Sequence, residues 1–270
     1  MLIFSFFAGC ITTDQLGREI QNLETGETPP TIWELDQIVV RPSWTKDDLS
    51  IPVLFAGLPE NSPEYFSIPD LPPPGDQGNQ ASGSAWAAGY VALSVLVNHE
   101  RGEKTYRCSP AFIYNSLNSG ADHGVELKDV LDLLKNTGCP RQELMPYRPE
   151  NYSERPDNNA YSQAASYRIR GFGRVEFTDV KQIKAHLLQR SVVLATLRIT
   201  EDFVSLKGPI WEKPSGEVIG RHTVAVVGYD NRKELFLVQN SAGSSWGQYG
   251  YASIPYAWFV RMAAQAYIMW

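Results

Sequence analysis

The pattern of apolar residues changes character after Tyr167, and this change restricts the architectures open to the chain. Apolar side chains are spaced as in helices in three earlier segments: residues 84–100, 109–117 and 126–136. Short runs typical of β-strands follow, with one amphipathic helix (180–189) among them: residues 192–200, 223–229, 235–239 and 251–254. Helices followed by strands predict an α+β fold with two segregated lobes. A groove between such lobes is a favoured place for a site.

Local signals mark where the predicted helices begin and end. Ser109 before Pro110 is a typical helix start, because serine caps the first turn and proline fits within it. Gly102 and Gly138 stand where helices are expected to stop. The first of these helices, residues 84–100, has small and apolar residues on nearly every face, so we expect it to be buried in the core.

Composition and charge exclude several classes of function. The chain has 270 residues, 43% of them hydrophobic, and a formal net charge of −6 with acids and bases interspersed. There is no basic patch of the kind that neutralises phosphates, so we expect no nucleic-acid partner. The histidines and cysteines show no metal-ligand spacing, so no metal site or other cofactor is expected.

The first ten residues, MLIFSFFAGC, form an apolar run that is too short to cross a bilayer as a helix. They resemble the end of a bacterial lipoprotein signal, in which a small-residue pair, here Ala8 and Gly9, precedes a lipidated cysteine, here Cys10. This predicts an exported lipoprotein of the cell envelope, periplasmic or on the outer surface, that meets the membrane only through a lipid on Cys10. The alternative is an unmodified apolar end.

Residues 11–65 are polar and rich in turns and prolines, and we interpret them as a tether and N-terminal extension before a domain at 66–270. The apolar stretch from Ile51 to Phe55 is expected to dock on that domain. Two cysteines remain besides Cys10. Cys108 and Cys139 either form one disulfide or remain as two buried thiols, and their spacing does not decide between these alternatives.

Thiol acyl transfer needs a nucleophile, a base, a group that orients the base, and donors to an oxyanion. Three segments of the chain carry residue types for three of these four roles. They begin with Asp76-Gln77-Gly78 and Gly83-Ser84-Ala85-Trp86-Ala87, continue with His222-Thr-Val-Ala-Val-Val-Gly-Tyr, and end with Asn240-Ser-Ala-Gly-Ser-Ser-Trp-Gly. Each is a weak signal alone, since a histidine on an apolar strand is usually a core residue. Their order and their positions on predicted helix and strands make the conjunction informative.

Taken together, these segments resemble the papain-like cysteine peptidase family, and bacterial members more than plant ones. The separations are 222 − 85 = 137 and 240 − 85 = 155 residues, close to that family's spacing of roughly 130 to 150 residues. The resemblance covers about residues 68–270. It implies a two-lobed fold with a helical left lobe, a β-barrel-like right lobe and the site in the groove between them.

The resemblance also assigns roles to individual residues. It implies that His222 is the base, Asn240 orients it, Gln77 donates to the oxyanion, and Ala85 stands where the family has its nucleophilic cysteine. The chain as written is therefore expected to bind an extended peptide or protein segment in the groove without hydrolysing it. The alternative is an active cysteine endopeptidase whose nucleophile was deliberately changed from Cys to Ala, and residue 85 of the native gene separates the two.

Substrate contacts implied by the resemblance come from residues beside the nucleophile position, a glycine edge and an aromatic wall: Gly83, Ser84, Trp86, Gly124 and Trp246. The alternative for Gly124 and Trp246 is a structural role. Two departures from the family pattern stand out. The loop between Gln77 and Gly83 is two residues longer than in plant-type members, and Ala242 replaces a tryptophan that covers the Asn–His hydrogen bond. We therefore expect that hydrogen bond to be more exposed to water. The other histidines are expected to be structural: His99, His123 and His186.

The lipoprotein hypothesis is testable on its own. If Cys10 is lipidated, the protein should incorporate labelled fatty acid and partition into the membrane fraction, and the Cys10→Ser variant should lose both properties. Wild-type protein that stays soluble and unlabelled in its native cell would contradict the hypothesis.

Overall fold

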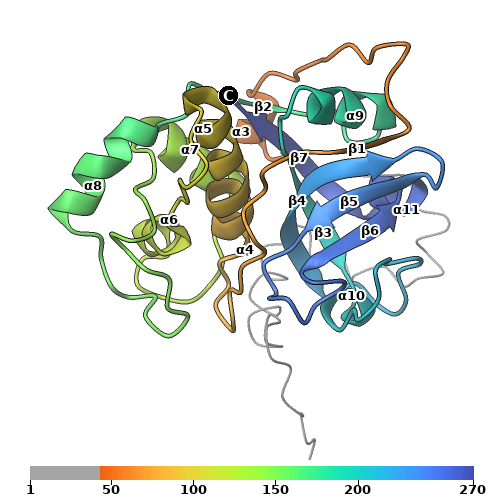
Figure 1. The fold of residues 1–270 in the computed structure, drawn as a ribbon. Helices are drawn as coiled ribbons and strands as arrows, with labels where there is room; N and C mark the ends of the chain where they lie inside the picture. Colours follow the sequence, from red (N-terminus) through yellow and green to blue (C-terminus); the bar gives the residue numbers. More distant parts are fainter. Residues whose placement is uncertain (1–42) are drawn as a thin grey trace, which may run out of the picture.

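The computed structural model describes residues 43–270, which form two lobes (Figure 1). One lobe is mostly helical and the other is built on a sheet, as the change in pattern after Tyr167 predicts. The fold is therefore α+β. The signal at residues 1–10 with Cys10, and the part of the extension before residue 43, lie outside the described residues.

A buried central helix lies where the two lobes meet (Figure 1). It comprises α4 (Gly83–Ala85), a π-helical stretch η1 (Trp86–Leu93) and α5 (Ser94–Arg101). Every residue of η1 is buried, because small and apolar side chains occupy all of its faces. Gly102 ends the helix in the left-handed conformation, with φ 64°, which glycine adopts without strain. The predicted helix and its stop are confirmed.

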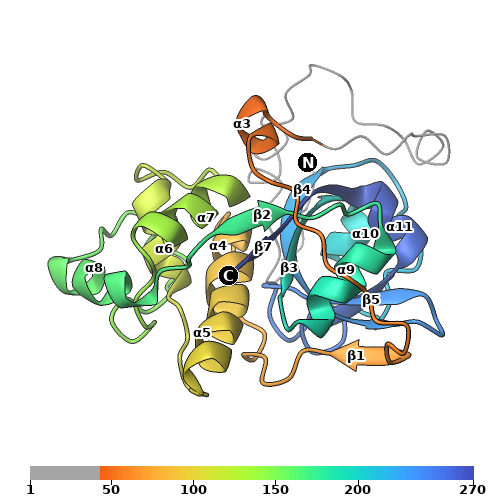
Figure 2. The ribbon, with the colours of Figure 1, turned by 90° about the horizontal axis from the view of Figure 1, so that it is seen from above.

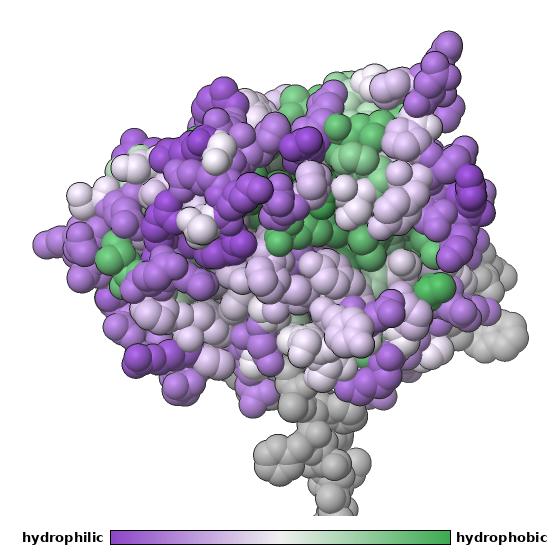
Figure 3. All heavy atoms as spheres, in the orientation of Figure 1, coloured by the Kyte–Doolittle hydropathy of each residue, from purple (hydrophilic) through white to green (hydrophobic). Residues whose placement is uncertain are grey.

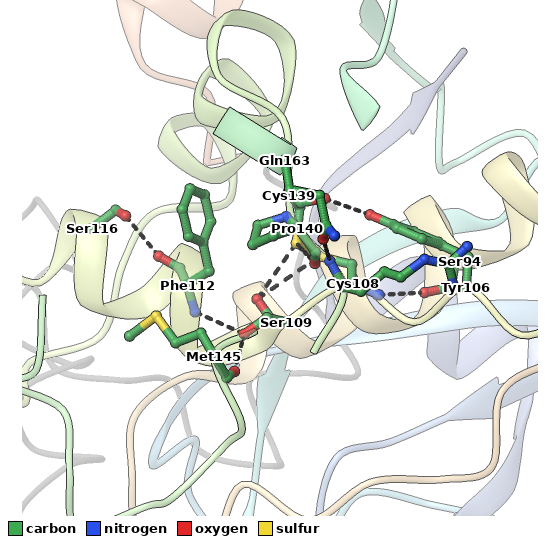
Figure 4. Close-up of a disulfide and its surroundings, with 11 residues drawn as sticks. Ser94, Tyr106, Cys108, Ser109, Phe112, Ser116, Cys139, Pro140, Met145 and Gln163 are labelled. Carbon is green, nitrogen blue, oxygen red and sulfur yellow. Dashed lines mark hydrogen bonds between the residues drawn. A yellow bond between two sulfur atoms is a disulfide. The ribbon is translucent and has the colours of Figure 1, made fainter. Parts of the chain in front are cut away.

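The remaining helices of this lobe pack around the central one. They are α6 (Pro110–Leu117), α7 (Leu127–Asn136), α8 (Asn158–Ala164) and the short η2 (Ala165–Tyr167). The Ser109 side chain caps α6 by accepting from the backbone N–H of Phe112 at 3.0 Å, and its hydroxyl donates to the carbonyl of Met145. Cys108 and Cys139 form a disulfide beside this cap (Figure 4).

Within the described residues, seven strands form one antiparallel sheet in the order β2-β7-β3-β4-β5-β6, with β1 also paired to β4. Their bounds are β1 (Tyr65–Ser67), β2 (Phe172–Arg174), β3 (Val193–Ile199), β4 (Gly220–Asp230), β5 (Leu235–Gln239), β6 (Tyr251–Pro255) and β7 (Ala263–Met269). The four strands predicted from the sequence are confirmed, with ends that shift by at most a few residues. The strand order is not closed into a ring, since β2 and β6 each have one neighbour on this path.

Three strands and several short helices were not predicted. β7 is buried along its whole length between β2 and β3, but its alanines and glutamine are poor strand formers, so tertiary pairing decides its conformation. The amphipathic helix α9 (Val180–Leu188) is confirmed. It is not alone in the sheet lobe, because α10 (Glu201–Val204) and α11 (Tyr256–Met262) also interrupt the strands.

The N-terminal part of the described chain lies against the sheet lobe. The backbone N–H of Leu54 donates to the carbonyl of Arg174, and that of Arg174 donates to the carbonyl of Pro52, both at 2.9 Å. Ile51 is buried. The predicted docking of residues 51–55 is confirmed, and Figure 2 shows this orange segment running from α3 (Lys46–Leu49) past α9 to β1.

Most of the surface seen in Figure 3 is hydrophilic, and hydrophobic residues gather in a band from its centre to its upper right. In the part of the chain that the structure describes, no helix is both long and apolar enough to cross a membrane.

The close packing of the central helix predicts a specific sensitivity to volume. A Cβ atom on Gly89 would lie 2.3 Å from Cδ1 of Ile113 and 2.7 Å from Sγ of Cys108. We expect Gly89→Ala to destabilise the fold by about 1–3 kcal/mol, because the added methyl overpacks the core. The matched control is Gly57→Ala, where no heavy atom lies within 4 Å of the new methyl. Thermal unfolding should separate the two variants by several degrees, and equal melting temperatures would contradict the described packing.

Candidate active site

The start of the central helix meets strand β4 residue by residue. A Cβ atom on Gly83 would lie 2.7 Å from Cε1 and 3.0 Å from Nδ1 of His222, so this close approach requires glycine. The next residue of the helix, Ser84, bonds through its hydroxyl to that of Thr223, at 3.1 Å. Ala85 follows and is fully buried. The structure thus brings the predicted helix start and the predicted histidine strand together.

His222 and Asn240 form a buried hydrogen-bonded pair. The ring Nε2 lies 2.7 Å from Oδ1 of Asn240, which also accepts from the backbone N–H of Ser241. Because Oδ1 can only accept, Nε2 carries the hydrogen, and the neutral ring then has a lone pair at Nδ1. Nδ1 is buried and has no hydrogen-bond partner among residues 43–270. The pair holds one ring nitrogen and leaves the other directed at the helix start.

Burial lowers the pKa of His222 to about 4, and the hydrogen bond to Asn240 offsets this only in part. The ring is therefore neutral at pH 7. The expectation of a water-exposed hydrogen bond was wrong, since His222 and Asn240 are each 5% exposed. The ring of Phe203, from α10, is a neighbour of the His222 ring, with ring centroids 6.1 Å apart.

Gln77 lies beside Gly83, and both polar atoms of its side-chain amide form hydrogen bonds. Its Nε2 donates to the carbonyl of Gln80 at 2.8 Å, and its Oε1 accepts from the hydroxyl of Ser241 at 2.7 Å. Gln80 belongs to the loop that is two residues longer than in plant-type members. The role of Gln77 as an oxyanion donor stays a prediction, and it depends on the second hydrogen of Nε2.

Two tryptophans predicted to touch substrate are packed inside the lobes instead. Trp86 is 6% exposed and lies edge-on to Tyr90 and Tyr147, with ring centroids 4.8 Å apart in both pairs. Trp246 is 2% exposed, and its indole N–H donates to the carbonyl of Phe203. Neither ring offers a surface to a ligand in this arrangement. Each has enough apolar area to be drawn into a core, which sequence position alone does not reveal.

Of the three other predicted contact residues, Ser84 and Gly124 line one pocket between the lobes, and Gly83 lies against His222 instead. The residues before α7 form one side of it, and strands β3 and β4 form the other. Its lining includes Ser84, Gly124, Val125, Thr196, Arg221 and Thr223. Four of these were not singled out from the sequence: Val125, Thr196, Arg221 and Thr223. The signal that could have found the threonines is their place on predicted strands.

None of the remaining histidines lines this pocket. His186 is buried under the docked N-terminal segment, where its Nε2 lies 3.3 Å from the carbonyl of Leu54, and burial lowers its pKa. His123 bonds to the carbonyl of Gly124, and His99 lies near Arg190. Among residues 43–270, no cluster of three or more His, Cys, Asp or Glu side chains could hold a metal ion.

A two-lobed α+β fold with a His–Asn pair facing the start of a buried helix defines a class of thiol-dependent hydrolases. Residues 72–267 match the family described as papain family cysteine protease. The chain therefore belongs to the papain family of cysteine proteases.

Known proteins similar to this chain come from different organisms. An uncharacterized peptidase C1-like protein of Acanthamoeba polyphaga mimivirus is 28% identical over 201 residues, which cover 67% of this chain and 63% of that protein. A cathepsin B-like protein, CP3, of Giardia intestinalis is 26% identical over 78% of this chain and 79% of its own length. The alignment thus spans less than two thirds of the mimivirus protein.

Among solved structures, xylellain, a cysteine protease from Xylella fastidiosa, has the same fold, with a TM-score of 0.75. It is 21% identical to this chain, and the match covers 84% of this chain and 93% of xylellain. At this identity the likeness concerns the fold.

The depressed pKa of His222 predicts a pH-dependent stability. An unfolded histidine titrates near 6.5, so between pH 6.5 and 4 the unfolded chain binds a proton that the folded chain does not. Stability should therefore fall as the pH decreases through this window, with a contribution from His222 of about 2 kcal/mol between pH 7 and pH 5. Urea unfolding at the two pH values measures it.

The control variants separate His222 from the second buried histidine. His222→Gln keeps an amide that can donate to Asn240 but does not titrate, so it should lose this part of the pH dependence. His186→Gln should retain it. The prediction fails if the parent protein and His222→Gln lose the same stability between pH 7 and pH 5.

Proposed function

We propose that this chain is a peptide-binding member of the papain family in which Ala85 occupies the nucleophile position, so that it does not hydrolyse peptides. One observation carries the proposal. The Nδ1 lone pair of His222, buried and without a hydrogen-bond partner among the described residues, faces Gly83 at the helix start, two residues before Ala85.

The chemistry explains why the substitution matters so much. In a thiol peptidase the base accepts the proton of the cysteine thiol, and the resulting thiolate attacks the peptide carbonyl. A methyl group has neither a lone pair nor an acidic proton, so no acyl intermediate can form at residue 85. The base and its orienting amide remain here as parts of a site that lacks its reacting atom.

Peptide binding depends on different parts of the molecule. The pocket between the residues before α7 and strand β4 lies beside the helix start. Ser84 is half-exposed there, whereas Ala85 is covered. An extended peptide that crosses this groove would place one side chain in the pocket and its backbone along the rim.

The kinship with bacterial members and the place of the protein in the cell envelope stay proposals that rest on the sequence motifs around residues 76–87 and on Cys10. Neither is needed for the binding site.

The decisive experiment restores the thiol. The parent protein should show no detectable turnover of an unstructured peptide. Triad enzymes that lose their nucleophile retain a rate enhancement of only about 10³–10⁴-fold over the reaction in water. In Ala85→Cys the new thiol should react with iodoacetamide at pH 6 at least about tenfold faster than free cysteine, because the helix start and His222 favour the thiolate. The rate of alkylation and the turnover of the peptide are measured on the full chain.

The double variant Ala85→Cys, His222→Gln is the matched control. It should react no faster than a free thiol. If the thiol of Ala85→Cys is equally slow, or if the second change makes no difference, then Ala85 and His222 do not belong to one site. Peptide turnover by the parent protein that persists after repeated purification would contradict the non-hydrolytic function.

A further inference from the structure

Three hydroxyl groups form a continuous chain along one wall of the interlobe pocket. The hydroxyl of Ser84 lies 3.1 Å from that of Thr223, and the hydroxyl of Thr223 lies 3.2 Å from that of Thr196. The three residues come from three elements: α4, β4 and β3. The His222–Asn240 pair does not use them.

The strand register explains why the threonines meet. Thr196 of β3 and Thr223 of β4 are directly paired across the antiparallel ladder, so their side chains lie on the same face of the sheet. His222 is one residue away on β4 and projects from the opposite face. The sheet thus presents its histidine on one side and its threonines on the other, and the helix start contacts both.

The three hydroxyl groups retain hydrogen-bonding capacity for a ligand. Each hydroxyl has one hydrogen and two lone pairs. Two of the three hydrogens serve the two bonds within the chain, which leaves one hydrogen and several lone pairs for another group. Thr196 and Thr223 are 7% and 4% exposed, so a ligand that fills the pocket would exclude water from them.

An apolar ligand would therefore be penalised. Covering a hydroxyl without replacing its bond to water costs free energy, whereas a ligand that both donates and accepts restores the bond. The rim adds one charge of each sign, since the guanidinium of Arg221 lies 3.3 Å from the carboxylate of Glu126. This pairing gives no strong preference for a charged ligand.

We infer that the pocket of Ser84, Thr196 and Thr223 selects a neutral polar side chain of the bound peptide, with the carboxamide of Asn or Gln fitting best. A carboxamide supplies both a donor and an acceptor, which matches the spare hydrogen and lone pairs of the hydroxyl chain. This inference rests on the proposed peptide-binding function and names the class of peptide that the site takes.

Alanine hexapeptides with blocked ends test the selection. Each series of peptides varies the residue at one of the six positions. Their dissociation constants for the full-length protein are measured by calorimetry. In one series, Asn or Gln should bind about tenfold more tightly than Leu. Thr223→Val and Thr196→Val remove one hydroxyl each at nearly constant volume, and each should reduce or reverse this ratio.

Thr105→Val is the matched control, because Thr105 is exposed on the helical lobe and should leave the ratio unchanged. Circular dichroism checks that each variant is folded. If one variant does not fold, the relative affinities of the parent protein for the peptides still test the inference. Tightest binding of Leu, Phe or a charged residue in every series would overturn the inference while peptide binding itself stands. Absence of saturable binding of any peptide would overturn the proposed function and this inference with it.

Discussion

The contact between the start of the central helix and strand β4 is the constraint on which the site depends. Gly83 lies against the ring of His222 so closely that no other residue fits, and Ser84 bonds to Thr223. Two consecutive residues of one lobe thus fix two consecutive residues of the other. Because β4 is also the centre of the sheet, paired with β1, β3 and β5, this contact sets how the whole sheet lobe sits against the helices.

The burial of the His222–Asn240 pair has a different origin from the one that the family resemblance implies. A cluster of aromatic rings surrounds Phe203, whose ring lies 4.8 Å from that of Trp211 and 5.1 Å from that of Trp246. Phe203 also lies against His222. Neighbouring aromatic residues can therefore keep water from the pair although residue 242 is alanine.

Much of the fold could be predicted from the sequence, because periodicity and end signals are local. The central helix stops at Gly102, and α6 begins at the Ser109 cap, as their sequence signals indicate. Strand β7 could not be predicted, since its conformation depends on pairing with β2 and β3 and not on its own residues.

For the site, motif order predicted that the helix start, His222 and Asn240 meet, and Gly83 and Asn240 both lie against His222. Motif order did not reveal which side chains are buried in the lobes and which line the pocket. Trp86 and Trp246 lie inside the lobes, whereas Thr196 and Thr223 line the pocket. Burial is a property of the assembled packing, so a motif match carries no information about it.

The docked N-terminal segment has a consequence for how the chain reaches this structure. Asp48 accepts a hydrogen bond from Tyr267, 219 residues further along, and Gln265 donates to the carbonyl of Ser43 across 222 residues. Contacts of such long range require closure of nearly the whole chain, which is entropically costly and slow. On a ribosome, the segment around α3 is made early, but its contacts with Gln265 and Tyr267 can form only after the last strand has been made. The docking of this segment is therefore completed only at the end of synthesis, and a chain truncated before β7 would keep its contacts with Arg174 but lose those with Gln265 and Tyr267.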